Sequence, residues 1–102
     1  MINDYKERVR KINSINGWIW PYDPWNVEHY IGEKLMLVVT EVSEAMEAVR
    51  EDDRKNFNWE IADTFIRLID ICDALNIDID EQIETVLKAL EKRPFRHGGK
   101  RA

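Results

Sequence analysis

Hydrophobic residues recur at the 3.6-residue period of an α-helix along most of this chain, and this pattern restricts the fold more than any other feature. Only four glycines and three prolines interrupt the 102 residues, so the turn residues that an all-β fold requires are scarce. We expect an all-α fold of about four helices in a single domain, residues 1–102, with a basic C-terminal tail at 94–102. The expected helices cover residues 2–14, 26–50, 56–75 and 78–92.

Polar residues that cap helix ends set the expected boundaries. Asn26 is the expected N-cap of the second helix, Asn56 or Asn58 that of the third, and Asp78 that of the fourth. Asn76 fits the left-handed position that often follows a helix C-terminus. These assignments predict a short charged connector between the two longest helices, which favours an antiparallel pair.

The two longest helices are also the reason to expect more than one subunit. A helix of about 25 residues spans roughly 37 Å, which is long for a compact domain of this size. Hydrophobic residues of the third helix cover more than one stripe, so this helix must be buried on two sides. We therefore expect the bundle to be completed by oligomerisation. A homodimer and a homotetramer fit the pattern equally well.

Charge and composition exclude several classes of function. Residues 1–91 carry all 20 acidic residues and 10 basic ones, whereas 92–102 carry a charge of +5. An acidic body repels the nucleic acid backbone, so we expect no nucleic acid partner. No apolar run is long enough to cross a membrane, and the N-terminus is charged where a signal peptide would be apolar. With Cys72 as its single cysteine, we expect a cytoplasmic protein without disulfides.

Two pairs of carboxylates are the strongest candidates for chemistry. Glu41 and Glu44 are three residues apart on the second helix, and Glu60 and Asp63 repeat this spacing on the third. Such spacing puts both members of a pair on one helix face, where like charges destabilise the helix. Acidic pairs are common on solvated faces by chance, but these lie among the most apolar stretches of the chain. A divalent cation held by all four carboxylates would offset the cost. Arg67 and Asp70 continue the stripe of the second pair.

The carboxylate pairs belong to a longer pattern that resembles the MazG-like all-α nucleoside triphosphate pyrophosphohydrolases. The chain has an ExxE and an ExxD motif at the separation typical of that superfamily, followed by an RPxxHGGK-like ending. The similarity covers about residues 15–100. The segments that carry it are Lys34 to Arg50, Ile61 to Asp70, and Arg93-Pro-Phe-Arg-His-Gly-Gly-Lys100.

The resemblance implies an enzyme that cleaves an NTP or dNTP between the α and β phosphates to give NMP and pyrophosphate. It implies that Mg²⁺, or Mn²⁺ in its place, is bound by Glu41, Glu44, Glu60 and Asp63. The general base is left open: Glu44 and Glu47 are candidates on geometry alone, not by the resemblance. The expected substrate-binding residues are aromatic side chains for the nucleobase and basic ones for the phosphates: Trp18, Trp20, Lys34, Lys88, Arg93, Arg96 and Lys100.

One departure from the superfamily supports a second hypothesis. Many members carry a Lys and an Asn shortly before the RP element, whereas this chain has no Asn after Asn76 and its nearest lysines are Lys88 and Lys92. The alternative is a non-catalytic helical interaction module with the same fold. The sequence leaves the preferred base and sugar open.

Overall fold

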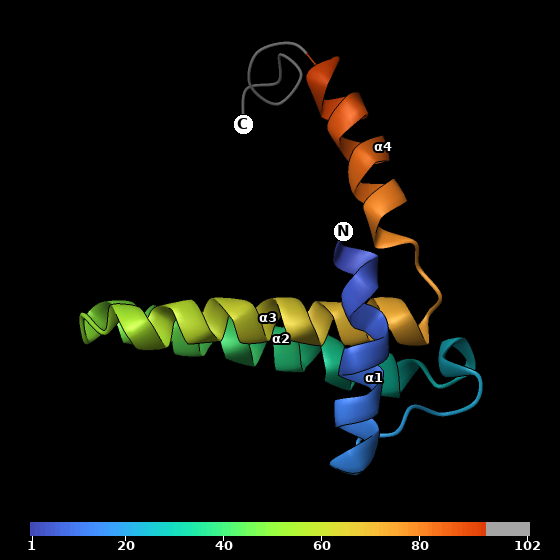
Figure 1. The fold of residues 1–102 in the computed structure, drawn as a ribbon, viewed down its shortest axis with the longest axis horizontal. Coiled ribbons are helices and arrows are strands. Elements are labelled where there is room, and N and C mark those ends of the chain that lie inside the picture. Colours follow the sequence, from blue (N-terminus) through green and yellow to red (C-terminus); the bar gives the residue numbers. More distant parts are fainter. Residues whose placement is uncertain (94–102) are drawn as a thin grey trace.

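The structure is a computed structural model that describes residues 1–93, apart from the side chain of Glu28. All regular elements in this part of the chain are helices, as the sequence predicted, and no strand occurs among them (Figure 1). Two are short 3₁₀ helices, η1 and η2, and four are α-helices. In chain order they are η1 (Ile2–Tyr5), α1 (Lys6–Ile15), η2 (Pro24–Asn26), α2 (Glu28–Arg50), α3 (Arg54–Ala74) and α4 (Ile79–Glu91).

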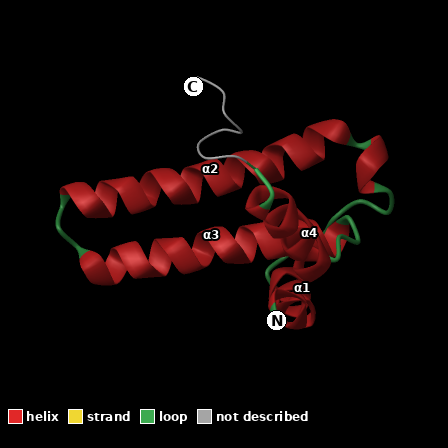
Figure 2. Ribbon diagram, turned by 90° about the horizontal axis from the view of Figure 1, so that it is seen from above, coloured by secondary structure: helices red, strands yellow, loops and turns green. Residues whose placement is uncertain are grey.

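The α2–α3 hairpin is the largest feature of the fold. The two helices run antiparallel and pack along one another, with α2 behind α3 in Figure 1 and beside it in Figure 2. Asp52 turns the chain with a φ of 52°, and the side chain of Asp53 accepts a hydrogen bond of 3.0 Å from the Asn56 backbone N–H. Asp53 is therefore the N-cap of α3, and the predicted caps Asn56 and Asn58 are wrong, because both lie inside the helix.

Other predicted helix ends have mixed outcomes. The predicted N-cap Asn26 is wrong, because the chain forms η2 there and α2 begins only after Val27. The predicted first helix is divided into η1 and α1. Asp78 does cap α4, since its side chain accepts a 3.2 Å hydrogen bond from the Glu81 backbone N–H. Asn76 has a φ of 59°, which confirms the left-handed position expected after α3.

Helix α4 projects away from the hairpin, and its first turn is tied to the N-terminus of the chain (Figure 1). Asp80 accepts hydrogen bonds from the backbone N–H groups of Ile2 and Asn3, at 2.9 and 3.1 Å. In return, the Asn3 side chain accepts a 3.1 Å hydrogen bond from the Ile79 backbone N–H. These reciprocal caps fix the start of α4. Beyond that start, every residue from 81 to 93 is exposed.

The seam between α2 and α3 is small and charged, whereas the hydrophobic stripe of α2 lies on the outside. Ala45 and Ala48 are buried in the hairpin, together with Lys34, Glu41 and Glu60. The stripe one residue further along α2 is 50–57% exposed and consists of Leu35, Val39, Val42, Met46 and Val49. The hairpin therefore encloses its polar groups and presents apolar ones. None of the helices in residues 1–93 combines the length and hydrophobicity of a membrane span.

Candidate metal centre

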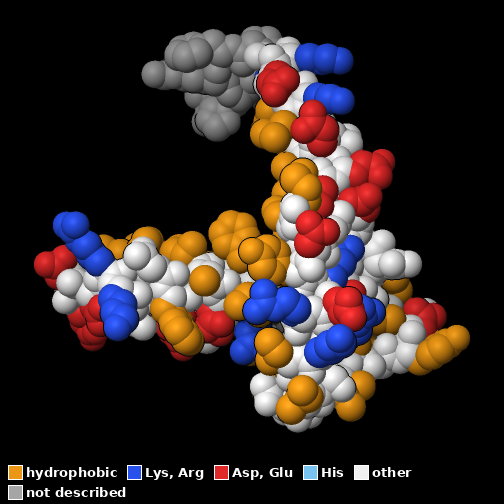
Figure 3. Space-filling view, in the orientation of Figure 1, with side chains coloured by type: hydrophobic (Ala, Val, Ile, Leu, Met, Phe, Trp, Pro, Cys, Tyr) orange, Lys and Arg blue, Asp and Glu red, His pale blue; other side chains and the backbone are white. Residues whose placement is uncertain are grey.

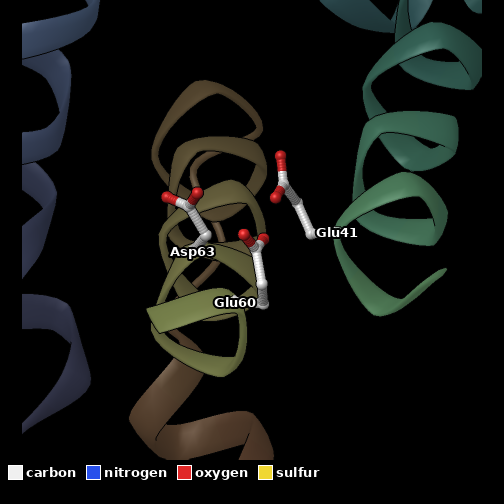
Figure 4. Close-up of side chains that lie close together, drawn as sticks. All are labelled: Glu41, Glu60 and Asp63. Carbon is white, nitrogen blue, oxygen red and sulfur yellow. The ribbon is translucent and has the colours of Figure 1, made fainter. Parts of the chain in front are cut away.

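Three of the four predicted carboxylates converge in the middle of the hairpin. Glu60 and Asp63 project from successive turns of α3, and Glu41 meets them from α2 (Figure 4). Each residue contributes one carboxylate oxygen, and the three oxygens all lie within 4.8 Å of one another. Spacing along α3 places two of them on one face, and the antiparallel packing of the hairpin adds the third.

Glu44 lies at the edge of this cluster. It is exposed and is not one of the three residues whose oxygens lie within 4.8 Å. Its carboxylate is nonetheless close enough to Glu60 to affect the pKa of that residue. Glu47, the other predicted candidate for the general base, is exposed one turn further on and forms an ion pair of 3.1 Å with Arg50.

Burial of the cluster makes it unusual among acidic groups. Glu41 and Glu60 are only 7% and 8% exposed, and the Oε2 atom of each has no hydrogen-bond partner among the described residues. Burial, then the neighbouring carboxylates of Glu41 and Glu44, raise the pKa of Glu60 to about 7. Unpartnered, buried carboxylate oxygens are costly unless a cation satisfies them. Hard oxygen ligands of this kind suit Mg²⁺ or Mn²⁺, so the residues present fit a divalent cation.

The raised pKa predicts that metal-free protein loses stability as the pH rises. Between pH 4.5 and about 7 the folded chain holds a proton on Glu60 that the unfolded chain has released, so the free energy of unfolding falls across this interval. Urea unfolding in EDTA, from pH 4.5 to 8, will measure this loss as the difference between the wild type and Glu60→Gln. A difference that stays constant with pH would contradict it. Saturating Mg²⁺ is expected to reverse the loss.

A cationic side chain is part of the cluster's surroundings. Nε of Arg67, one turn beyond Asp63 on α3, lies 3.5 Å from Oε1 of Glu41. The guanidinium carbon of Arg67 is also 5.9 Å from the centre of the Trp18 ring. Trp18 belongs to residues 16–23, which link α1 to η2 and also carry Trp20 and Tyr22, and this segment is called the aromatic loop below. Arg67 thus connects the carboxylates of the hairpin to the aromatic loop.

The aromatic loop is held against the hairpin by a buried lysine. Nζ of Lys34 lies 4.9 Å from the ring centre of Trp18, 5.5 Å from that of Trp20 and 5.3 Å from that of Tyr30. Its nearest carboxylate is Asp70, at 3.9 Å, which also accepts a 3.0 Å hydrogen bond from Nε1 of Trp20. The desolvation of Lys34 lowers its pKa, and Asp70 opposes this shift. Lys34 is 4% exposed and therefore lies inside this aromatic cage.

A cavity of about 550 Å³ opens between α1 and α3, next to the acidic cluster. Asp63 and Arg67 line it from α3, Arg8 and Asn13 line it from α1, and Trp18 lines it from the segment that follows α1. It therefore combines a metal-ligand candidate, cations and a half-exposed indole ring in one concave surface.

Two further predicted site residues, Lys88 and Arg93, lie apart from the cluster. Lys88 is on α4, exposed and 3.8 Å from Glu84, and Arg93 follows the end of the same helix. Arg96 and Lys100 lie outside the described residues. Conversely, no role was predicted for Arg67 and Asp70. Their spacing from Asp63, four and seven residues along one helix, was the signal that places them on the same stripe.

The described residues form an all-α protein. Its α2–α3 hairpin encloses a candidate cation site, and a concave surface lies beside that site. The family model described as the MazG nucleotide pyrophosphohydrolase domain matches residues 31–97, which include both carboxylate pairs. The chain therefore belongs to this family, as the sequence motifs indicated. No curated protein and no solved structure matches the chain significantly.

Proposed function

We propose that this protein is a Mg²⁺-dependent nucleoside triphosphate pyrophosphohydrolase that cleaves an NTP or dNTP to NMP and pyrophosphate. The observation that carries the proposal is the convergence of Glu41, Glu60 and Asp63 in a chain of this family. Two buried oxygens of this cluster have no hydrogen-bond partner within residues 1–93. Carboxylates arranged in this way are suited to a cation that also contacts phosphates.

We assign the binding of the cation and the activation of water to different carboxylates of the chain. Glu41, Glu60 and Asp63 would hold the cation, with Glu44 at the exposed edge. When bound, a divalent cation supplies charge neutralisation for the phosphates and lowers the pKa of an attacking water. Of the two candidate bases, Glu44 is the better placed to accept a proton on its carboxylate, because Glu47 is paired with Arg50.

For the nucleoside, we propose the cavity between α1 and α3. Trp18 is 48% exposed there and offers a ring face for stacking, whereas the Nε1 of Trp20 is committed to Asp70. Lys34 would act by holding this loop in place, since it is buried in the aromatic cage. Lys88, Arg93, Arg96 and Lys100 remain proposed phosphate contacts.

The buried, unpaired Cys72 supports a cytoplasmic location.

Turnover of a panel of NTPs and dNTPs with Mg²⁺, followed as pyrophosphate release, tests the proposal. We expect hydrolysis of at least one substrate, and its loss in Glu41→Gln and in Asp63→Asn. Calorimetry with a non-hydrolysable analogue separates the alternative function, because an interaction module without chemistry would show no Mg²⁺-dependent nucleotide binding. No turnover with any substrate, or unchanged turnover in both variants, would contradict the enzyme.

We further propose that the chain works as a homo-oligomer. Its radius of gyration is 16.4 Å, against about 13 Å for a compact chain of this length. On the side of α4 that faces the hairpin, hydrophobic side chains gather in the open angle between the two (Figure 3). The exposed apolar residues of α4 are Ile83, Val86, Leu87 and Leu90. A second copy, which carries the same stripes, would cover them isologously.

Light scattering after size exclusion will measure the oligomer. We expect a dimer or tetramer for the wild type and a smaller species for Leu87→Glu, because a buried charge in an apolar interface is costly. Glu91→Gln, an exposed change on the same helix, is the control and should not alter the mass. A monomeric wild type at micromolar concentration would overturn the proposal.

A further inference from the structure

We propose that Arg67 is the protein's ligand for the phosphates of the substrate, held ready in the metal-free state by its contacts with Glu41 and Trp18. This inference rests on the proposed function, since it requires a phosphate-bearing substrate in the cavity between α1 and α3. It adds a binding residue that neither the sequence motifs nor the family match assigned.

The position of Arg67 is the first argument. It lines the cavity together with Asp63, so it borders both the candidate cation site and the space beside it. A polyphosphate whose oxygens reach a cation at Asp63 would pass directly by this guanidinium. Arg8 also lines the cavity, but among the basic residues of 1–93 it is Arg67 that forms an ion pair with a carboxylate of the acidic cluster.

The second argument is that the donors of Arg67 are largely unused. Its ion pair with Glu41 involves Nε at 3.5 Å, which is longer than a hydrogen bond, and no hydrogen bond from its guanidinium occurs within residues 1–93. The side chain is 26% exposed. An arginine has five N–H donors in a planar fork that matches the geometry of phosphate. The guanidinium carbon lies 5.9 Å from the centre of the Trp18 ring, a cation–π contact that uses none of the N–H donors.

The third argument is electrostatic and gives the proposal its sharpest consequence. A cation 3.5 Å from Glu41 offsets the negative charge of that carboxylate and therefore opposes the binding of a bare metal ion. The same positive charge attracts phosphate. Removal of Arg67 should thus strengthen the binding of metal alone and weaken the binding of a polyphosphate. A purely structural residue would not change the two affinities in opposite directions.

Arg67→Gln tests these two effects in the full-length chain. Calorimetry with Mn²⁺ alone should give a dissociation constant about 3- to 10-fold lower than that of the wild type. Inorganic tripolyphosphate in saturating Mg²⁺ should bind about 10- to 100-fold more weakly, as expected for the loss of charge-assisted hydrogen bonds. Arg67→Lys should keep the wild-type affinity for Mn²⁺ but recover only part of the affinity for tripolyphosphate, because an ammonium is not a bidentate donor.

Arg54→Gln, an exposed change of equal charge at the start of α3, is the matched control and should leave both affinities near those of the wild type. The proposal is overturned if Arg67→Gln binds tripolyphosphate as tightly as the wild type, or if both affinities fall together with reduced helicity. If the wild type itself binds neither tripolyphosphate nor any nucleotide analogue with Mg²⁺, the proposed function fails, and this inference fails with it. If instead the wild type binds tripolyphosphate and Arg67→Gln binds it equally well, only the inference about Arg67 fails and the proposed function stands.

Discussion

Glu60→Gln is expected to make the metal-free protein more stable at pH 8 and, at the same time, almost inactive. The wild-type carboxylate is buried beside Glu41 and near Glu44, and its pKa of about 7 means that it is largely charged at pH 8. A neutral amide removes this repulsion, so the melting temperature in EDTA should rise by several degrees. The same change removes a proposed cation ligand, so pyrophosphate release should fall by more than the ~10–100-fold expected for loss of a residue that only hydrogen-bonds to a metal ligand.

The two effects must be measured on one preparation. Thermal unfolding is followed by circular dichroism with EDTA and again with Mg²⁺, where the stabilisation by Mg²⁺ should be smaller in Glu60→Gln than in the wild type. Glu51→Gln, an exposed acidic residue in the turn between α2 and α3, serves as the control. A variant that loses stability in EDTA, or that keeps wild-type turnover, would count against the cluster as a cation site.

Asp70→Asn is expected to produce the largest loss of stability of any single polar substitution in the described hairpin. The Asp70 side chain is 6% exposed, lies 3.9 Å from Nζ of Lys34 and accepts the hydrogen bond of Trp20. Removal of one partner of a buried ion pair typically costs about 3–5 kcal/mol, because the other charge stays buried. The free energy of unfolding, measured in urea at pH 7, should fall by an amount in this range.

A double variant shows whether the pair itself is responsible. Lys34→Met should also destabilise, but Lys34→Met with Asp70→Asn should cost less than the sum of the two single changes, because no unpaired charge remains. Asp70→Asn should also lower the pKa of Lys34 further. At a pH between this lowered pKa and 10.5, the unfolded variant still binds the lysine proton that the folded variant has released. The free energy of unfolding of the variant should therefore increase as the pH rises toward 10.5. Additive single effects and a flat pH profile would mean that the two residues are not coupled.

Local features of the fold were largely predictable. The helical period located all four α-helices, and Asp78 and Asn76 were assigned correctly because capping depends on neighbours a few residues away. The errors at Asn26, Asn56 and Asn58 have one cause. Each is a residue able to cap, but a competing local arrangement was adopted: η2 at the first position and the Asp53 cap at the others. Where several residues able to cap lie close together, the packing of the hairpin decides which of them becomes the N-cap.

The candidate site was predictable along each helix but not between helices. The ExxE and ExxD spacing predicted that four carboxylates converge, and three of them do, whereas Glu44 lies outside the group. Nothing in that spacing indicated that Arg67 would contact Glu41, or that Asp70 would contact Lys34, since the members of each pair are 26 and 36 residues apart. Such contacts depend on the axial register of α2 against α3. The connector between the helices and the residues buried between them set this register together.

By itself, the sequence determined that this chain is helical, where the helices lie, which acidic residues share a face and which family the chain belongs to. The tertiary structure decided which side of α2 faces α3. A rotation of α2 by one residue, about 100°, would exchange the charged seam of Lys34 and Glu41 for the apolar stripe that begins at Leu35. Periodicity fixes positions around one helix axis, whereas the rotation of that axis relative to its neighbour is set by packing. Here the small side chains of Ala45 and Ala48 let the helices approach along the seam, so the carboxylates are enclosed and the apolar stripe is exposed.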